Sequence, residues 1–97
     1  MLAKLKSSDF RPYLQQKFYV FLDENDFLEV ELIEVSDYPE QNLDTGRPFD
    51  LVFRLPKGFV LPQETYTFKQ DQLGKLELFV VPIGSDGKGQ LYQAVFN

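Results

Sequence analysis

Three residue types are missing from this 97-residue chain, which contains no cysteine, no histidine and no tryptophan. Without cysteine there is no disulfide and no thiolate nucleophile, and without histidine there is no imidazole for general acid or base chemistry. The same absences exclude metal sites that depend on thiolate or imidazole ligands. We therefore predict a noncatalytic protein with no bound cofactor and no resident metal.

A long hydrophobic run is also missing. The start of the chain, residues 1–8, has no apolar stretch typical of a secretion signal. No later window approaches the roughly 20 apolar residues of a membrane-spanning helix. We expect a cytoplasmic protein without a membrane partner.

Positive charge is absent from the second quarter of the chain. Residues 21–45 hold nine acidic side chains and no base, and the formal net charge of the whole chain is −5. Nucleic-acid binders neutralise phosphates with Lys and Arg, so we predict no nucleic-acid partner. We interpret the acidic stretch as a solvated strand face and loop.

Part of the acidic stretch resembles the ends of a calcium-binding loop. Asp23, Asn25 and Glu34 have that spacing, but Leu28 stands at the position that needs glycine for a sharp turn. We therefore expect no calcium loop, and whether the acidic segment 23–44 binds a cation weakly at its surface stays open.

Aromatic residues are plentiful, with 10 Phe and 5 Tyr in a chain that is 43% hydrophobic and 26% charged. The length fits one domain over residues 1–97. Near its start, Phe10, Tyr13 and Leu14 have the spacing of one helical face, and Pro12 is acceptable in a first turn. We predict a short helix over residues 8–16.

From residue 17 the apolar period changes to two, which is typical of strands. Asp23 to Asp26 have the chemistry of a hairpin turn. The alternation changes phase after Leu32, and a β-bulge near Ile33 is the simplest explanation. The fold class predicted is all-β and mainly antiparallel, a six-stranded sandwich or partly open barrel with one short N-terminal helix. The expected strands span residues 17–23, 27–36, 49–55, 65–69, 75–83 and 90–96.

The motifs that could indicate catalysis fail on inspection. The glycines of residues 84–89 lack the Lys-Ser/Thr ending and the following helix of a phosphate-binding loop. Glu29 and Glu31 lie two apart on one strand face, a spacing loosely compatible with a glycosidase pair. Cross-strand pairing with a base such as Arg54 is the favoured interpretation.

Several strands are apolar on both faces, whereas one face of a sandwich strand should meet water. A two-turn helix of about 12 Å is too short to cover these second faces. We therefore predict a protein partner or self-association through an apolar surface. The candidate interface residues are Tyr19, Phe21, Phe79, Val81 and Tyr92.

An alternative hypothesis is a small-ligand or carbohydrate-binding β domain. In that hypothesis Tyr19, Tyr38 or Tyr92 would be exposed and would stack on the ligand. No small-molecule ligand can be named from the sequence, and neither the partner nor the oligomeric state follows from it.

Four segments resemble a family of small bacterial all-β proteins classed as a domain of unknown function: residues 47–54 (RPFDLVFR), 61–66 (LPQETY), 73–84 (LGKLELFVVPIG) and 92–97 (YQAVFN). The resemblance covers nearly the whole chain and carries no catalytic residue. Such proteins are sometimes associated with phage-tail-collar-like proteins, so the resemblance implies an accessory role in a phage-tail-like particle.

Overall fold

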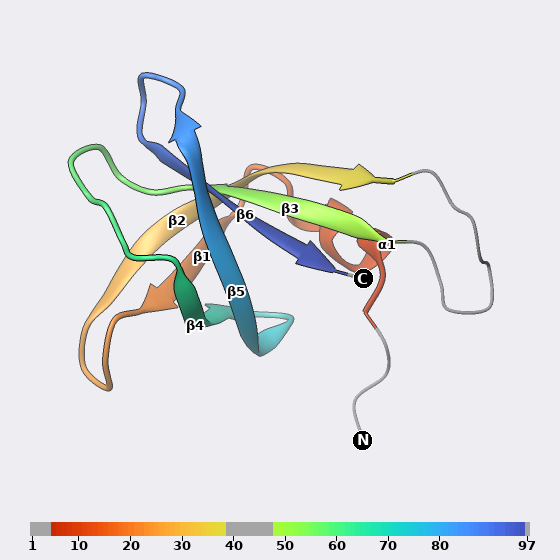
Figure 1. Cartoon of the computed structure of the whole chain (residues 1–97). Coiled ribbons are helices and arrows are strands. Elements are labelled where there is room, and N and C mark those ends of the chain that lie inside the picture. The colour runs from red at the N-terminus through yellow and green to blue at the C-terminus, as the bar shows by residue number, and fades with distance from the viewer. Residues whose placement is uncertain (1–4, 39–47, 97) are drawn as a thin grey trace.

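Six antiparallel strands form the body of the protein in a computed structural model that describes residues 5–38 and 48–96 (Figure 1). Turns with Asn, Asp and Gly separate the strands, as expected for hairpin connections. The strands are β1 (Lys17–Phe21), β2 (Phe27–Asp37), β3 (Phe49–Arg54), β4 (Glu64–Gln70), β5 (Gly74–Ser85) and β6 (Gln90–Phe96).

The strands close into a barrel in the order β1-β2-β3-β6-β5-β4. Closure depends on the pairing of β1 with β4, which joins Tyr19 to Lys69 and Phe21 to Thr67. The predicted all-β antiparallel class is confirmed, and of the two predicted architectures the barrel is present, fully closed. Closure removes the sheet edges that would otherwise expose unpaired backbone groups.

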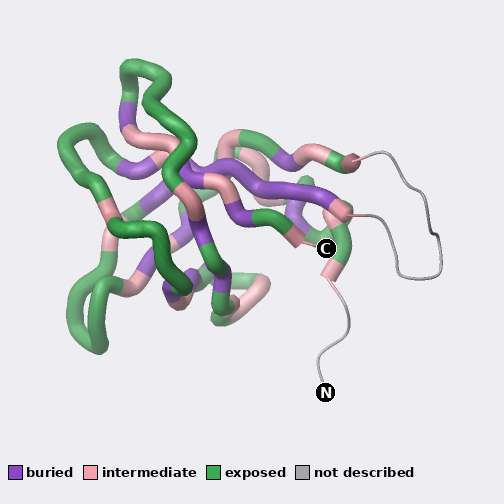
Figure 2. Tube along the Cα trace, in the orientation of Figure 1, coloured by how far each residue is buried: buried purple, intermediate pink, exposed green. Residues whose placement is uncertain are grey.

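The barrel interior is filled by one face of each strand. Phe18 packs edge-on against Phe53 with ring centroids 5.2 Å apart, and Phe53 lies 4.7 Å from Phe68. The strands are buried where they cross the middle of the barrel, and the turns are exposed (Figure 2). The interior is therefore complete without the second apolar faces that the sequence contains. Its buried apolar members on the strands include Phe18, Val20, Val30, Leu32, Leu51, Phe53, Phe68, Leu78, Val80 and Ala94.

The N-terminal helix is shorter than predicted. Instead of one helix over residues 8–16, α1 (Ser7–Phe10) is followed by a 3-10 turn, η1 (Arg11–Tyr13). Pro12 lies in the first positions of η1, where its missing N–H costs nothing. Gln15 then takes a positive φ of 64° and donates its N–H to the carbonyl of Leu32, which redirects the chain into β1.

This helix covers one end of the barrel and leaves the outer faces of β1 and β5 uncovered. Phe10 is fully buried, with ring centroids 5.9 Å from Phe49 and 5.5 Å from Phe96. Phe49 begins β3 and Phe96 ends β6, so α1 lies beside that end of the barrel in Figure 1. The helix therefore extends the core rather than shielding the second apolar faces.

The bulge predicted in β2 is confirmed. Leu32 pairs with Phe53 and Glu34 pairs with Val52, so Ile33 is the extra residue. The insertion lets both Leu32 and Val35 face the core. A second irregularity, between Pro82 and Gly84 in β5, was not predicted.

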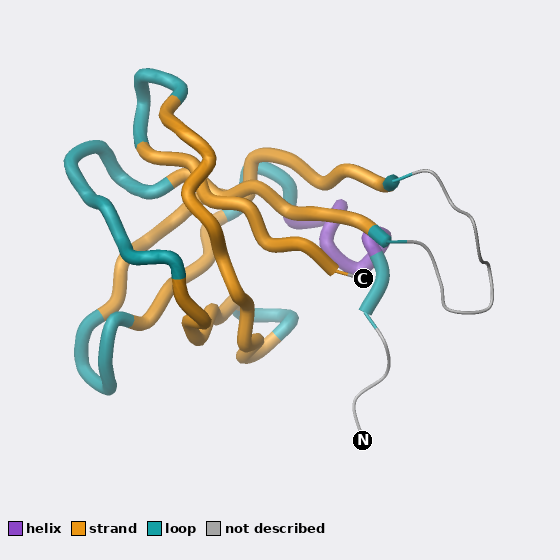
Figure 3. The backbone as a smooth tube through the Cα atoms, in the orientation of Figure 1, coloured by secondary structure: helices purple, strands orange, loops and turns teal. Residues whose placement is uncertain are grey.

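Three connections emerge at the end of the barrel opposite α1: the β1–β2 turn, the β3–β4 loop and the β5–β6 turn (Figure 3). β1 ends at Phe21, two residues earlier than predicted, because the Leu22 N–H donates to the carbonyl of Asp26 within the turn. β5 reaches Ser85, two residues further than predicted.

Candidate functional site

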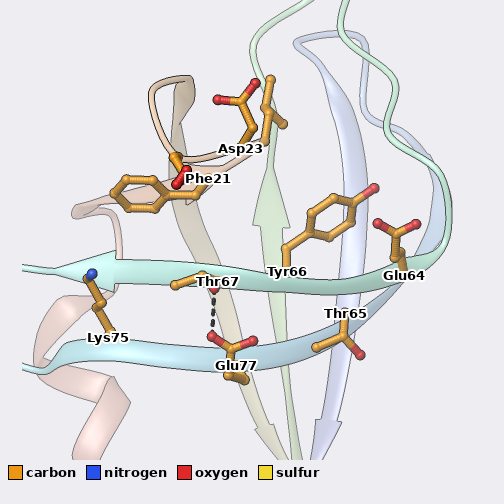
Figure 4. A pocket seen from close by; sticks show the side chains of 10 residues that line it. Phe21, Asp23, Glu64, Thr65, Tyr66, Thr67, Lys75 and Glu77 are labelled. Atoms are coloured by element: carbon orange, nitrogen blue, oxygen red, sulfur yellow. Dashed lines mark hydrogen bonds between the residues drawn. The ribbon is translucent and has the colours of Figure 1, made fainter.

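A groove follows the outer face of β4 and encloses about 450 Å³. Thr65 and Thr67 have short side chains and line it on β4. Figure 4 shows Phe21 on one side of this strand and Lys75 and Glu77 on the other. The groove arises because small residues on β4 lie between larger ones on β1 and β5.

Three aromatic side chains on β1 and β2 form what we call the aromatic strip: Tyr19, Phe21 and Phe27. Phe21 and Phe27 are register partners, and their rings stack with centroids 5.8 Å apart. The Tyr19 ring lies 5.3 Å from that of Phe27. Phe27 is 49% exposed, although aromatic rings contribute most when buried. The strip therefore presents contiguous aromatic surface to solvent.

Two lysines lie on the β4 and β5 side of the aromatic strip, and we call Lys69 and Lys75 the lysine pair. They are register partners on the outer faces of β4 and β5. Like charges directly opposite each other destabilise a sheet. The Lys75 Nζ lies 5.9 Å from the centroid of the Phe21 ring. Within the described part of the chain, neither lysine forms an ion pair.

Acidic groups border both ends of this surface. The Asp23 carboxylate closes its own turn by accepting from the N–H groups of Asn25 and Asp26, at 2.8 and 2.9 Å. The Thr67 hydroxyl donates to Glu77 Oε2 at 2.6 Å. Burial, together with the nearby Glu64 carboxylate, raises the pKa of the Tyr66 phenol above its usual value. The site is therefore mixed in charge.

Two of the predicted interface residues, Tyr19 and Phe21, lie together in the aromatic strip. Phe79 lies further along the same outer surface, opposite Thr65 on β4, and is 52% exposed. Val81 lies beyond the start of β4, opposite Gln93, and is half-buried. These four residues are on outer faces, as predicted.

The prediction for Tyr92 was wrong, both as an interface residue and as an exposed stacking platform. Tyr92 is 1% exposed and belongs to the core. Its hydroxyl donates to the Leu61 carbonyl at 2.7 Å and accepts from the Leu61 N–H. A core position suits this tyrosine because the β3–β4 loop satisfies its polar end.

The Tyr38 side chain is also held by a hydrogen bond. Its hydroxyl donates to Asp50 Oδ2, and this hydrogen bond to a carboxylate raises the pKa of the phenol above its usual value. Gln93 Nε2 donates to the same oxygen at 3.0 Å. Asp50 faces away from the barrel interior, as expected from the alternation, yet it is almost fully buried.

A second hollow, of about 420 Å³, lies beside the two glutamates that the sequence singled out. Glu31 Oε1 is 2.9 Å from Arg54 Nη1, which confirms the expected cross-strand pairing. Glu29 Oε1 is 3.5 Å from Lys17 Nζ. Each carboxylate therefore has a cationic neighbour.

Two exposed residues of this surface were missed. Phe27 begins the predicted strand 27–36, and its register position opposite Phe21 was available from the predicted hairpin. Val95, 46% exposed, lies in the predicted strand 90–96 but is not among the predicted interface residues. Alternation separates two faces, but it does not identify the inner one when both are apolar.

Other classes of site were searched over residues 5–38 and 48–96. In these ranges no group of three or more acidic side chains is placed to hold a metal ion. The same ranges contain no helix that is long and apolar enough to span a membrane. The part of the acidic segment beyond residue 38 lies outside the described residues, so whether that part binds a cation stays open.

A comparison with protein families matches residues 5–96 to a domain of unknown function, DUF6916. No curated protein and no solved structure matches the chain significantly.

Proposed function

We propose that this chain, which belongs to the DUF6916 family, is a noncatalytic protein-binding or assembly module that uses its outer aromatic surface. The observation that carries the proposal is the aromatic strip, with Phe27 half exposed although the barrel interior is already filled. Contiguous apolar patches on a soluble protein often mark interaction sites.

A second exposed apolar pair lies on β5 and β6, on the far side of the barrel from the aromatic strip. Phe79 precedes Val80 and Val95 follows Ala94, and because Val80 and Ala94 are register partners, Phe79 and Val95 are outer-face neighbours. Both are about half exposed. Burying a large apolar side chain contributes about 1.5 to 3 kcal/mol, so a few such residues can supply most of the affinity of a partner.

The residues available for catalysis support a noncatalytic role. The chain has neither His nor Cys, and the two neighbouring glutamates of β2 each have a cationic neighbour. The Thr67 hydroxyl in the groove donates to Glu77 Oε2, and neither residue has an imidazole or thiol beside it, because the chain contains neither.

The resemblance described above extends the proposal to a class of partner. It implies a bacterial protein associated with a phage-tail-collar-like protein, as an accessory to a tail-like particle, and a cytoplasmic location is proposed from the absence of a signal-like start. An assembly role in such a particle needs an exposed binding surface and no reaction centre, which is the combination proposed here.

The test is binding of the purified chain to the tail-collar-like protein of the same genome and to itself, by sedimentation and by surface-immobilised binding. Phe27→Asp and Phe79→Asp are expected to weaken binding at least about tenfold, because each buries a charge in an apolar contact. Val60→Asp is the matched control, since Val60 is 74% exposed in the β3–β4 loop, outside the surface. Absence of both kinds of binding would overturn the proposal.

A second candidate function is a small-ligand or carbohydrate-binding domain, and the groove over Thr65 and Thr67 favours it. Phe21 could stack on a sugar ring while the hydroxyl and carboxylate groups accept or donate hydrogen bonds. Thermal unfolding with a panel of sugars and metabolites tests this. A ligand at 100 times its dissociation constant stabilises by about 2.7 kcal/mol, and Glu77→Gln should reduce the shift. A panel without any shift would count against it.

A further inference from the structure

We propose that the groove binds an extended, basic segment of a protein partner, which adds as a strand along the edge of β4 at residues 64–66. This inference rests on the proposed protein-binding function and adds the chemistry of the partner. An interruption in the strand pairing provides the place for that segment, and the charges around the interruption determine its chemistry.

Barrel closure stops short of the first residues of β4. β1 pairs with β4 from Tyr19 to Phe21, opposite Lys69 to Thr67. On its other side β4 pairs with β5 over its whole length. Within the described part of the chain, residues 64–66 therefore have a strand neighbour on the β5 side only. Unpaired backbone groups at such an edge are a template for another strand.

The β1–β2 turn creates this open edge. If β1 continued in register, the residues after Phe21 would lie opposite those before Thr67. Instead the N–H groups of Leu22 and Asp23 donate to the Asp26 carbonyl, at 2.8 and 3.4 Å, so the chain bends away from β4. The groove is lined by the turn residues 22–24 and by residues 64–67 of β4. It therefore occupies the place that a longer β1 would take (Figure 4).

Carboxylates surround this groove. Its lining contains four acidic side chains against one base, Lys75. The ion pairs found among the described residues all involve other acids. An incoming Lys or Arg side chain would thus meet an excess of negative charge that no base of the described chain neutralises by direct pairing. The four acids are Asp23, Glu24, Glu64 and Glu77.

The charges select among the segments that the edge could bind. Backbone hydrogen bonds at a strand edge accept any sequence, so side chains supply the specificity. An acidic segment would be repelled by the carboxylates, whereas a basic one would be attracted and could lay its methylene groups along the Phe21 ring. Lys75 pairs with Lys69, away from the β5 residues that face the open edge. Because strand side chains alternate, the occupant that fits carries Lys or Arg at every second position.

The experiment measures the binding of three labelled peptides to the purified chain by fluorescence anisotropy. One peptide alternates Thr and Lys, the second alternates Thr and Glu, and the third is the Thr-Lys peptide with its backbone nitrogens methylated. We expect the Thr-Lys peptide to bind. The other two should bind at least about tenfold more weakly, because one has the wrong charge and the other lacks backbone donors.

Variants that remove one charge locate the site. Glu24→Gln and Glu64→Gln keep the side-chain shape and should each weaken Thr-Lys binding about threefold, and the double variant at least about tenfold. Asp71→Asn is the matched control, because it removes one exposed acid in the β4–β5 turn, outside the groove. Circular dichroism verifies that each variant is folded.

Three outcomes would contradict the inference. Absence of Thr-Lys binding, or equal binding of its methylated form, overturns strand addition, while the aromatic strip would still stand on the test given for it above. Equal or tighter binding of the Thr-Glu peptide overturns the basic chemistry. Equal losses in Asp71→Asn and Glu64→Gln would mean that the net charge of the chain attracts the peptide, which overturns the groove as its site.

Discussion

Tyr92 shows how the position of one side chain identifies the inner face of a strand. β6 carries apolar residues on both faces, and a tyrosine is acceptable at a protein surface. The sequence pattern therefore did not show which face of β6, the one with Tyr92 or the other, is the inner face. In the structure the Tyr92 hydroxyl makes two hydrogen bonds to the backbone of Leu61, in the loop that leads into β4. The ring fills the core while the polar end fastens the loop.

Removing that hydroxyl tests its role. Tyr92→Phe keeps the ring and leaves the Leu61 N–H and carbonyl without their partner, so we expect a loss of about 1 to 2 kcal/mol in the free energy of unfolding. Urea unfolding followed by circular dichroism measures it. Tyr13→Phe is the matched control, because Tyr13 packs partly against the core and forms no hydrogen bond through its hydroxyl with any described residue. Equal effects of the two substitutions would contradict the assignment.

Gly89 shows a constraint that strand patterns do not reveal. A Cβ at this position would lie 2.0 Å from the Leu55 carbonyl oxygen, so any side chain would push the β5–β6 turn away from the end of β3. From the sequence, the glycines of residues 84–89 were considered as a phosphate-binding loop, and that interpretation was set aside. In the structure Gly89 is buried at a close backbone contact.

At the scale of elements, the bulge at Ile33 allows one long strand to serve two parts of the core. Before the bulge β2 faces the barrel interior through Val30 and Leu32. After it, Val35 continues on the same side, toward the end covered by α1. With simple alternation, Glu34 rather than Val35 would follow Leu32 onto the inner face.

Neighbouring substitutions distinguish the bulge from simple alternation. Leu32 is fully buried, so Leu32→Ala should cost about 2 to 5 kcal/mol in unfolding free energy. Ile33 is only half-buried, so Ile33→Ala should cost well under half as much. Chemical unfolding of both variants is the measurement. A larger cost at Ile33 would mean that the bulge is placed at the wrong residue.

At the scale of the whole molecule, Arg54 links elements that are far apart in sequence. It pairs with Glu31 on β2 and, through Nε and Nη2, with Asp86 in the β5–β6 turn at 2.9 and 2.7 Å. Its hydrogen bond to Asp86, with help from the backbone N–H of Lys88, lowers the pKa of that carboxyl below its usual value.

The lowered pKa of Asp86 predicts a pH dependence with a definite sign. The stabilisation is present above the usual value of 3.8 and is lost as pH falls through the lower folded-state pKa. Arg54→Gln should therefore destabilise the protein at neutral pH, and its difference from wild type should shrink in acid. Urea midpoints across pH measure this, with the exposed Lys57→Gln as control. A difference independent of pH would contradict the electrostatic explanation.

Much of the fold could be predicted because local patterns encode it. The hairpin turn at Asp23 depends on its own side chain bonding to the next backbone groups, and the β2 bulge appears as a change of apolar phase. The helix was overestimated because residues 10, 13 and 14 have helical spacing, while Pro12 and the need to enter β1 end the helix early. Of the candidate site, Tyr19, Phe21, Phe79 and Val81 were placed on outer faces correctly.

The sequence by itself determined the strands, their turns and the missing catalytic groups, because these follow from residue type and from side-chain periods of two. Only the tertiary structure decided which apolar face is inside, because that depends on how strands distant in sequence pair. The pairing of β1 with β4 closes the barrel and brings Phe21 beside Thr67 and Lys69 beside Tyr19. Register between these distant strands, which no local pattern encodes, therefore creates the surface proposed for assembly.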